Sequence, residues 1–446
     1  MSKDDPCFDP WCDPENPRKI KYEDIAAAGK RLVGQVIRTP LLKSKIPDLP
    51  VELYLKADFL QVTGSFKERG IVNTLLLLSD EQRKYGVISA TTGNHGLALA
   101  YHAARMNIPA IIVMALSVSL NKAMKIEKYG VKVVLYGASL DDARRHAIGL
   151  AKEKKMLYVN GFDHPNICEG QGTCGLEILE DLPDVDAVLI PVGGGSLVTG
   201  CLVAIKHLKP DTEVYGIESD KTNAMTESLK RGERVFLPMG PALCNAMSVN
   251  LVGVNTFHTI KGLIDKMVVV TEDYVANAIL RLQEDDRYQI EGAGAAGVAC
   301  IMAGLFPNLK GKKVVVIASG GNIEPICLMR ALQHGMALEG RLVEFVLKMA
   351  DKKGALVELT ESIASANSVI RDIEHQHTWM KGEVFSVVVK VLLETKNWEH
   401  AKQVQQALKK AYPDIVFTEQ NSGLGQSGGP SRRGPCMAPN PICMQK

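Results

Sequence analysis

The chain has 446 residues, of which 46% are hydrophobic and 5% aromatic, and its 52 basic and 50 acidic residues leave a net charge of +2. A chain of this length folds into two or three domains with a large aliphatic core. The balanced charge, without a basic stripe that carries interleaved aromatic residues, argues against nucleic acid as a partner, and no apolar stretch has the length of a membrane span.

Both ends of the chain have the composition of disordered segments. Residues 1–19 are rich in Asp and Pro and lack the basic and apolar regions of a secretion signal. Residues 421–446 are rich in Gly, Ser and Pro. We therefore expect a disordered leader over 1–19, a disordered tail over 421–446 and a cytoplasmic protein.

Between these ends, short β-branched runs alternate with helical patterns. Their near-continuous apolar character is typical of parallel strands that are covered on both faces. The strands are predicted at 85–90, 110–114, 131–136, 187–192, 214–218 and 314–319, and examples of the intervening helices at 95–105, 139–154 and 196–208. This alternation predicts an α/β fold over residues 20–335.

The pattern changes after Gly340. Residues 341–349 alternate as a strand, a helical pattern follows Gly354, and two further strands are predicted at 369–375 and 383–393. A second helix, containing Trp398 and Leu408, precedes a last strand at 415–419. The order βαββαβ predicts a separate ferredoxin-like α+β domain over 341–420.

The hexapeptide Ser65-Phe66-Lys67-Glu68-Arg69-Gly70 contains the first candidate catalytic residue. It precedes an apolar helical run, and partial burial there would lower the pKa of Lys67 and favour the neutral amine that forms Schiff bases. Taken alone, the hexapeptide is better explained by an ordinary lysine at a helix start. Three glycine-rich turns further along the chain strengthen the functional interpretation.

Each of these turns follows a predicted strand. Thr91-Thr92-Gly93-Asn94-His95-Gly96 opens a helix, whose free N–H groups suit an anion such as a carboxylate. Gly193-Gly194-Gly195-Ser196 has the character of a phosphate cradle, without the Gly-Lys-Ser/Thr ending of a nucleoside-triphosphate loop. Ser319-Gly320-Gly321-Asn322 ends the last core strand, and Ser319 is either a helix cap or a neutral partner for a pyridine nitrogen. Because ligands of open α/β sheets bind at the carboxyl ends of strands, the three turns are expected to converge.

A further glycine motif is excluded as a dinucleotide site. Glu291-Gly292-Ala293-Gly294-Ala295-Ala296-Gly297 matches the GxGxxG string, but a helical rather than a strand-like pattern precedes it. We expect these small residues to allow close helix packing, and Glu291 to be a candidate for the pocket wall.

Together these motifs resemble the fold-type II pyridoxal-phosphate enzymes, which share the fold of the tryptophan synthase β subunit, and in particular the threonine/serine dehydratases (threonine ammonia-lyases) and their relative serine racemase. The resemblance runs from about residue 20 to residue 330 and includes Gly170-Gln171-Gly172-Thr173. It implies a catalytic domain of two parallel-sheet subdomains, the smaller at about 68–163. The C-terminal module resembles the ACT-type regulatory domain of some threonine ammonia-lyases.

The resemblance implies a role for each motif residue. Lys67 would carry the cofactor covalently and act as the base at the substrate Cα, with Phe66 beside the ring and Asn94 bonded to the phenolic oxygen. The phosphate would be bound by Gly193, Gly194, Gly195 and Ser196, the pyridine nitrogen by Ser319, and the substrate carboxylate by Thr91, Thr92, Asn94 and His95.

Three positions depart from the family pattern. Ser196 replaces a fourth glycine, and its hydroxyl could bind the phosphate. Thr92 stands where racemases carry a serine, so it is a candidate proton donor on the ring face opposite Lys67. Glu218 matches one of two carboxylates that hold a cation in racemase-like relatives, but Ala224 stands at the second, which leaves only a weakly held cation at Glu218.

The resemblance therefore predicts a carbon–nitrogen lyase that converts L-threonine or L-serine into 2-oxobutanoate or pyruvate plus ammonia, through α,β-elimination of water. Serine or aspartate racemase and 3-hydroxyaspartate dehydratase stay open as alternatives, as does a binding protein that keeps the fold without the activity. A homodimer or homotetramer and an amino-acid effector at the ACT-like module are expected partners. A purely structural role of that module is nearly as well supported.

Overall fold

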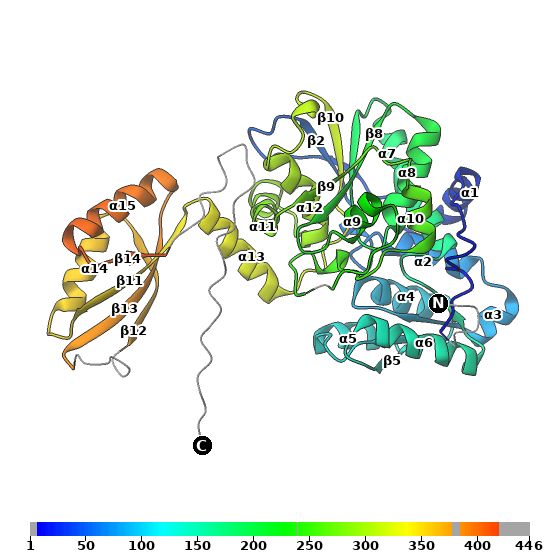
Figure 1. Ribbon diagram of the computed structural model, residues 1–446, viewed down its shortest axis with the longest axis horizontal. Coiled ribbons are helices and arrows are strands. Elements are labelled where there is room, and N and C mark those ends of the chain that lie inside the picture. The colour runs from blue at the N-terminus through cyan, green and yellow to red at the C-terminus, as the bar shows by residue number, and fades with distance from the viewer. Residues whose placement is uncertain (1–6, 239, 377–383, 419–446) are drawn as a thin grey trace, which may run out of the picture.

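The computed structural model describes residues 7–238, 240–376 and 384–418, which form three β-sheets flanked by helices (Figure 1). The large sheet has the order β1-β2-β10-β7-β8-β9, and all neighbours except β1 and β2 run parallel. Its strands are β1 (Leu41–Lys43), β2 (Glu52–Lys56), β7 (Ala187–Pro191), β8 (Glu213–Ser219), β9 (Lys266–Val270) and β10 (Lys313–Ile317). The predicted α/β core is confirmed, although β1, β2 and β9 were not predicted.

Helices cover both faces of the large sheet, which explains its continuous apolar strands. In β10, Val314 and Val316 pack in one core cluster with α11 and α12, whereas Val315 and Ile317 pack in another with α7 and α8. The helices of this unit are α1 (Tyr22–Leu32), α7 (Pro165–Asp181), α8 (Ser196–Leu208), α9 (Ala224–Arg231), α10 (Val254–Ile260), α11 (Glu272–Arg281), α12 (Gly292–Met302) and α13 (Pro325–Leu338). Helix α2 (Lys67–Leu76) packs its Ile71 and Leu75 in the core of the small sheet described next. Short helical turns lie at Asp58–Leu60, Asn245–Met247, Leu282–Asp286 and Pro307–Leu309.

The small sheet lies below the large one in Figure 1 and is wholly parallel, with the order β5-β4-β3-β6. Helices α4 and α5 pack on one face and α6 on the other. The elements are α3 (Asp80–Tyr85), β3 (Val87–Ala90), α4 (Asn94–Arg105), β4 (Ala110–Met114), α5 (Leu120–Glu127), β5 (Lys132–Leu135), α6 (Leu140–Lys154) and β6 (Leu157–Tyr158). We call this the small unit, and the unit around the large sheet the large unit.

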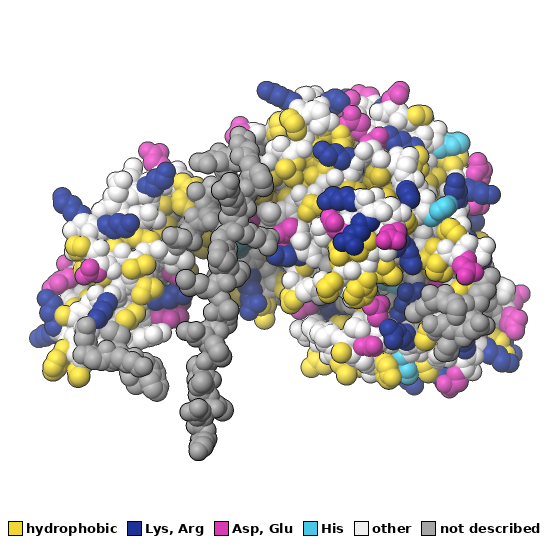
Figure 2. All heavy atoms as spheres, viewed as in Figure 1, with side chains coloured by type: hydrophobic (Ala, Val, Ile, Leu, Met, Phe, Trp, Pro, Cys, Tyr) yellow, Lys and Arg dark blue, Asp and Glu magenta, His cyan; other side chains and the backbone are white. Residues whose placement is uncertain are grey.

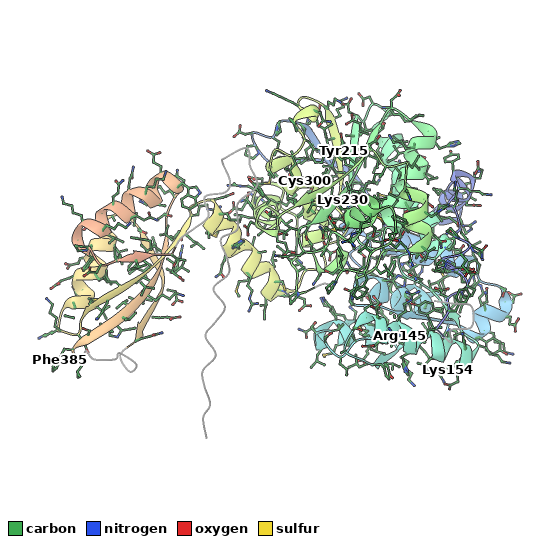
Figure 3. All side chains as sticks on the ribbon, in the orientation of Figure 1. Arg145, Lys154, Tyr215, Lys230, Cys300 and Phe385 are labelled. Atoms are coloured by element: carbon green, nitrogen blue, oxygen red, sulfur yellow. The ribbon has the colours of Figure 1, made fainter. Side chains whose placement is uncertain are left out.

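The C-terminal unit stands apart from the other two at the end of α13 (Figure 1). It contains β11 (Leu342–Ala350), α14 (Ala355–Ser365), β12 (Val369–Gln376), β13 (Ser386–Glu394), α15 (Trp398–Ala411) and β14 (Val416–Phe417) in an antiparallel sheet of order β12-β13-β11-β14. The order of elements is the predicted βαββαβ. Phe385 lies at the end of this unit farthest from α13 (Figure 3), and Arg341 pairs with Glu284 of the large unit at 2.8 Å.

The N-terminal leader differs from its prediction. Residues 7–19 were expected to be disordered, but Asp9, Cys12 and Asp13 are buried, and Asn255 donates a hydrogen bond to the carbonyl of Trp11 at 2.7 Å. Burial of an apolar thiol and an aromatic ring offsets the low overall hydrophobicity on which the prediction rested. The predicted tail, 421–446, lies outside the described residues.

Two surface properties bear on partners. Within the described ranges, no helix combines the length and the apolar character needed to cross a membrane. Figure 2 shows basic and acidic side chains interspersed over the face in view.

A buried ion network holds α2 against α7 and the turn at Asp58–Leu60. Arg69 is fully buried and donates two hydrogen bonds to Asp58, both at 2.8 Å, and two to Glu177 at 2.6 and 2.9 Å. Lys56, also fully buried, pairs with Glu177 at 2.8 Å and Asp181 at 3.2 Å. Burial alone would raise the pKa of Asp58, but Arg69 lowers it below the usual value. The buried charges of Arg69, Lys56 and Asp58 are therefore each stabilised by oppositely charged partners.

Replacing Arg69 with methionine is expected to lower the free energy of unfolding by about 3–5 kcal/mol, because Asp58 is left buried and unpaired. Urea denaturation measures this change. The matched control is Arg38→Met, which removes a half-exposed guanidinium paired with Glu180 and Asp181 and should cost about 1 kcal/mol or less. Equal effects of the two substitutions would contradict the importance of the buried network.

Candidate functional site

Lys67 is the first residue of α2, and the chain before it is fixed to the end of β10. Phe66 donates its backbone N–H to Ser319 O at 3.0 Å, and Gly321 donates to Gly64 O at 3.0 Å. Ser65 and Gly320 form an isolated antiparallel bridge. Gly64 has φ +77°, and a Cβ there would lie 2.8 Å from the Asn322 side chain, so this position requires glycine. The segment 64–67 and the turn at 319–322 are thus joined by backbone hydrogen bonds.

The Lys67 amine points from α2 toward the segment that follows β6. Its Nζ donates a hydrogen bond to Gly161 O at 3.0 Å and lies 4.9 Å from the centre of the Phe66 ring. The surrounding protein desolvates the ammonium and lowers the pKa of Lys67 to about 8, although Cys168 and Glu291 act in the opposite direction. The lysine thus has the environment that the sequence analysis expected.

The turn at 91–96 reaches the same place through its asparagine. Asn94 donates from Nδ2 to Glu291 Oε1 at 2.8 Å, and its Oδ1 accepts from Asn322 Nδ2 at 3.0 Å. Glu291 is buried, which raises its pKa, and its backbone N–H donates to Gly320 O at 3.0 Å. The Asn94 amide is therefore fixed in orientation, with one Nδ2 hydrogen beyond that used by Glu291.

The remaining predicted residues of this turn differ in exposure. Thr91 is buried and accepts the backbone N–H of Gly93 at 3.1 Å, whereas Thr92 is exposed. The first N–H groups of α4, which begins at Asn94, have no partners within the helix and remain available to an anion. The turn therefore offers backbone donors and the exposed Thr92 hydroxyl to a carboxylate.

His95 lies on the inner side of the same helix. Ser89 donates its hydroxyl hydrogen to Val159 O at 2.7 Å, so it accepts from His95 Nε2 at 3.0 Å. This assigns the tautomer with the proton on Nε2, and burial lowers the pKa of His95 to about 3, with a contribution from Lys67. The neutral ring is packed against Gly161, where a Cβ would lie 2.7 Å from it. An anion at this turn would thus meet the backbone N–H of His95 rather than its ring.

The glycine loop at 193–195 leads directly into α8, whose first residue is the buried Ser196. A Cβ at Gly193 would lie 2.9 Å from Met247 O, one at Gly194 would lie 2.2 Å from the Phe162 ring, and Gly195 has φ +108°. Side chains are therefore excluded at all three positions, for reasons of space or of backbone conformation. The loop presents backbone N–H groups at the positive end of a 13-residue helix.

The carboxylate of Glu218, the predicted cation ligand, is hydrogen-bonded to the start of α9. Both carboxylate oxygens accept hydrogen bonds from the start of α9, namely from Met225 N at 2.9 Å, Thr226 N at 2.8 Å and Thr226 Oγ1 at 2.6 Å. Burial raises the pKa of Glu218 to about 7. Among the described residues, no group of three or more His, Cys, Asp or Glu side chains is arranged to hold a metal ion. Glu218 therefore serves the helix start, where its oxygens satisfy orphan N–H groups.

Sequence analysis missed the contribution of residues 160–163, which connect β6 to α7. Gly161 accepts from Lys67, and the ring of Phe162 lies against Gly194. Asp163 accepts from the first N–H groups of α10, Val254 N at 2.7 Å and Thr256 N at 3.1 Å. Asn322 was quoted as part of a motif but given no role. The one feature of the sequence that could have drawn attention to residues 160–163 is their position after a strand, which the three recognised turns share.

Comparisons with known proteins agree with this geometry. The family model described as "Pyridoxal-phosphate dependent enzyme" matches residues 33–320. A protein of Thermotoga maritima named "L-threonine ammonia-lyase" is 37% identical over 391 residues, which cover 87% of this chain and 97% of that protein.

Two solved structures are also similar. One is the processed form of threonine deaminase isoform 2 from Solanum lycopersicum, with a TM-score of 0.66 and 34% identity, covering 72% of this chain and 95% of that chain. The other is maize serine racemase, with a TM-score of 0.67 and 26% identity, covering 72% of this chain and 99% of that chain. The family match over residues 33–320 includes Lys67, the turns at 91–96 and 193–196, and the strands of both parallel sheets.

Proposed function

Because this chain belongs to the pyridoxal-phosphate-dependent enzyme family, we propose that it is a carbon–nitrogen lyase acting on L-threonine and L-serine. The β-hydroxyl leaves as water, one water is taken up again when the resulting imine is hydrolysed, and the net products are ammonia with 2-oxobutanoate from threonine or pyruvate from serine. The observation that carries the proposal is the enclosed Lys67 amine with a pKa of about 8, at the point where the turns at 91–96, 160–163 and 319–322 meet.

The residues present fit pyridoxal phosphate. The glycine loop excludes side chains and ends at a helix N-terminus, as a phosphate requires. Lys67 is a weakly basic amine suited to a covalent bond with the aldehyde. Ser319, buried at the end of β10, supplies a neutral hydroxyl for the pyridine nitrogen. Phe66, Asn94 and Ser196 are proposed at the ring face, the phenolic oxygen and the phosphate, respectively.

When bound, pyridoxal phosphate supplies an electron sink for the charge that develops at the substrate Cα. Lys67 is proposed to take the proton from Cα and to pass it to the departing β-hydroxyl, which leaves as water. Thr91, Thr92 and the first N–H groups of α4 hold the substrate carboxylate and so orient the Cα–H bond. His95 is neutral, so its ring places no second positive charge near Lys67.

The function is tested by feeding the purified holoenzyme L-threonine, L-serine and 3-hydroxyaspartate and measuring the 2-oxoacid and ammonia formed. Equal amounts of both products from threonine or serine support the proposal. Absence of 2-oxoacid from all three substrates would overturn it.

Serine or aspartate racemisation is the second candidate, favoured by the exposed Thr92 at the start of α4 and by the similarity to maize serine racemase. Thr92 would deliver a proton to Cα from the side opposite Lys67. Chiral chromatography after incubation with L-serine separates the two reactions, because racemisation gives D-serine whereas elimination gives pyruvate.

The C-terminal unit is proposed to be an ACT-like domain that binds an amino-acid effector or joins protomers into a homodimer or homotetramer. Its βαββαβ order and its ion pair between Arg341 and Glu284 support a unit coupled to the catalytic core. A cytoplasmic location is also proposed, since the eight described cysteines are free thiols, as in a reducing compartment. Deleting residues 341–446 and finding an unchanged response to amino acids and an unchanged number of protomers in the assembly would contradict both roles of the unit.

The covalent capture of pyridoxal phosphate by the cofactor-free enzyme is expected to accelerate as pH rises through about 8, the pKa of Lys67. Burial lowers this pKa from the ordinary lysine value, so the neutral, reactive amine predominates above pH 8 instead of above pH 10. Stopped-flow absorbance across pH 6.5–10 measures the rate. A midpoint at the ordinary lysine value, as for a free lysine derivative measured in parallel, would contradict the enclosed environment.

A further inference from the structure

The N-terminal segment 7–19 contacts both the large and the small unit. Trp11 accepts a hydrogen bond at its carbonyl from Asn255 Nδ2 in α10 at 2.7 Å, and Cys7 Sγ donates to Arg145 O in α6 at 3.9 Å. Helix α10 belongs to the large unit and α6 to the small one, on which Figure 3 labels Arg145. In Figure 1 the dark-blue segment descends from α1 to the small unit. The segment therefore spans the junction of the two units.

Aromatic and polar contacts attach the segment to the start of α7. The Trp11 ring lies 4.6 Å from the ring of His164, and the guanidinium of Arg18 lies over the Trp11 ring at 4.4 Å from a ring centre. Asn255 binds three groups at once: Nδ2 donates to Trp11 O and, at 2.8 Å, to Asp163 O, while Oδ1 accepts from Arg18 N at 2.7 Å. The backbone of the leader and the backbone at Asp163 are thus held by the same side chain.

Cys12 extends this attachment into the interior. It is 6% exposed, and burial together with the negative charge of Asp163 raises its pKa, so the thiol stays protonated. Burial likewise raises the pKa of Asp163 to about 6, and a hydrogen bond from Cys12 acts in the opposite direction. Arg144 of α6 lies within the same group of charges. The leader thus contacts Asp163 through both a backbone bridge and a thiol.

Asp163 leads to the proposed cofactor site by two short routes. It caps α10 by accepting from Val254 N and Thr256 N, and Thr256 Oγ1 donates to Gly194 O at 2.7 Å. Along the chain, the two residues before it are Phe162, which packs on Gly194, and Gly161, which accepts from Lys67. Displacement of Asp163 would therefore move both the glycine loop and the acceptor of the catalytic amine.

We propose that residues 7–19 form a strap that positions the segment 160–164 and, through it, Lys67 and the glycine loop for pyridoxal phosphate. Trp11 is the central positioning residue, because its ring and its carbonyl contact His164 and Asn255. The inference rests on the proposed cofactor site but makes a separate statement: the leader, far from the catalytic turns in sequence, determines how tightly that site holds its cofactor.

The test compares three full-length variants. Trp11→Ala removes the ring from His164, Trp11→Phe keeps a ring there, and Trp398→Ala makes the same chemical change in the C-terminal unit, where the indole donates to Leu338 O. Two quantities are measured: the dissociation constant of pyridoxal phosphate for the cofactor-free protein, by fluorescence titration, and backbone hydrogen exchange at 160–164 and 253–256 in that cofactor-free protein.

Trp11→Ala is expected to raise the dissociation constant about fivefold to tenfold and to accelerate exchange in both segments. Trp11→Phe should restore both quantities to within about twofold of the wild type, and Trp398→Ala should change neither. If Trp11→Ala does not fold, Arg18→Ala, which removes only the exposed cation over the ring, should change both in the same direction. A Trp11→Ala protein that behaves like Trp398→Ala in both measurements, even with a lower melting temperature, would overturn the strap.

The exchange measurement also separates this inference from the proposed function. If the wild type binds no pyridoxal phosphate but Trp11→Ala still accelerates exchange at 160–164, the cofactor site is overturned and the strap's hold on the segment is supported. If the wild type binds pyridoxal phosphate and Trp11→Ala leaves exchange at 160–164 unchanged, the strap alone is overturned.

Discussion

Replacing Lys67 with alanine is expected to abolish 2-oxoacid formation, lowering kcat/KM for L-threonine by about 10⁴-fold or more. The substitution removes both the covalent attachment point and the proposed base at Cα. Lys56, which is fully buried, cannot replace it, because Lys56 is held by Glu177 and Asp181 in the ion network. Ketoacid release measures the activity, and borohydride reduction followed by peptide mapping locates the cofactor.

The control is Lys43→Ala. Lys43 has 63% of its side chain exposed and pairs with Glu52 at 2.8 Å, so its loss should leave the activity within about twofold of the wild type. Cofactor label on a lysine other than Lys67, or activity of the Lys67→Ala protein above about one per cent of the wild-type value, would contradict the assignment.

Gly194→Ala is expected to weaken pyridoxal-phosphate binding about tenfold to a hundredfold. The new Cβ would lie 2.2 Å from Cγ and 2.3 Å from Cδ2 of Phe162, so either the ring or the loop must move. Overpacking of this kind costs about 1–3 kcal/mol, and each 1.4 kcal/mol corresponds to a tenfold change in affinity. The dissociation constant of the cofactor, obtained by titrating the cofactor-free protein, measures the effect.

Gly149→Ala makes the same chemical change where space is available. Gly149 lies in the middle of α6, with nothing within 4 Å of the added Cβ. Alanine there should leave cofactor binding unchanged and stabilise the helix by about 1 kcal/mol or less. If both glycine variants bound the cofactor as the wild type does, the glycine loop would not be the phosphate cradle.

Elements with a strong local signal were predicted well. The strand at 110–114 and the helix at 196–208 have the predicted bounds, because an apolar β-branched run and a glycine-bounded helical pattern depend mainly on nearby residues. Strand β2 was not predicted, although it lies beside the central β10. Its alternating charged and apolar residues acquire a partner only when residues about 260 positions away fold against them.

Among the site residues, too, those with a local sequence signal were recognised and those that depend on distant contacts were not. The turns at 193–196 and 319–322 were recognised because each combines glycines with a predicted strand end, and the hexapeptide at 65–70 because its lysine precedes an apolar helical run. The structure joins the segments at 64–67 and 319–322 by hydrogen bonds. The roles assigned to Lys67, Thr92 and the cofactor-binding residues stay predictions. The cation role of Glu218 also stays a prediction, and only the fold reveals that its oxygens accept N–H groups of α9.

By itself, the sequence determined the chemistry: a lysine before an apolar helix and three glycine-rich turns, all readable within a few residues. Only the tertiary structure decided how these parts act on one another. The contact of Asn94 with Glu291 joins residues 197 positions apart, and that of Trp11 with Asn255 joins residues 244 positions apart. Such contacts depend on the complete packing of both units, so no local pattern could indicate that the leader is ordered or that it reaches the segment beside Lys67.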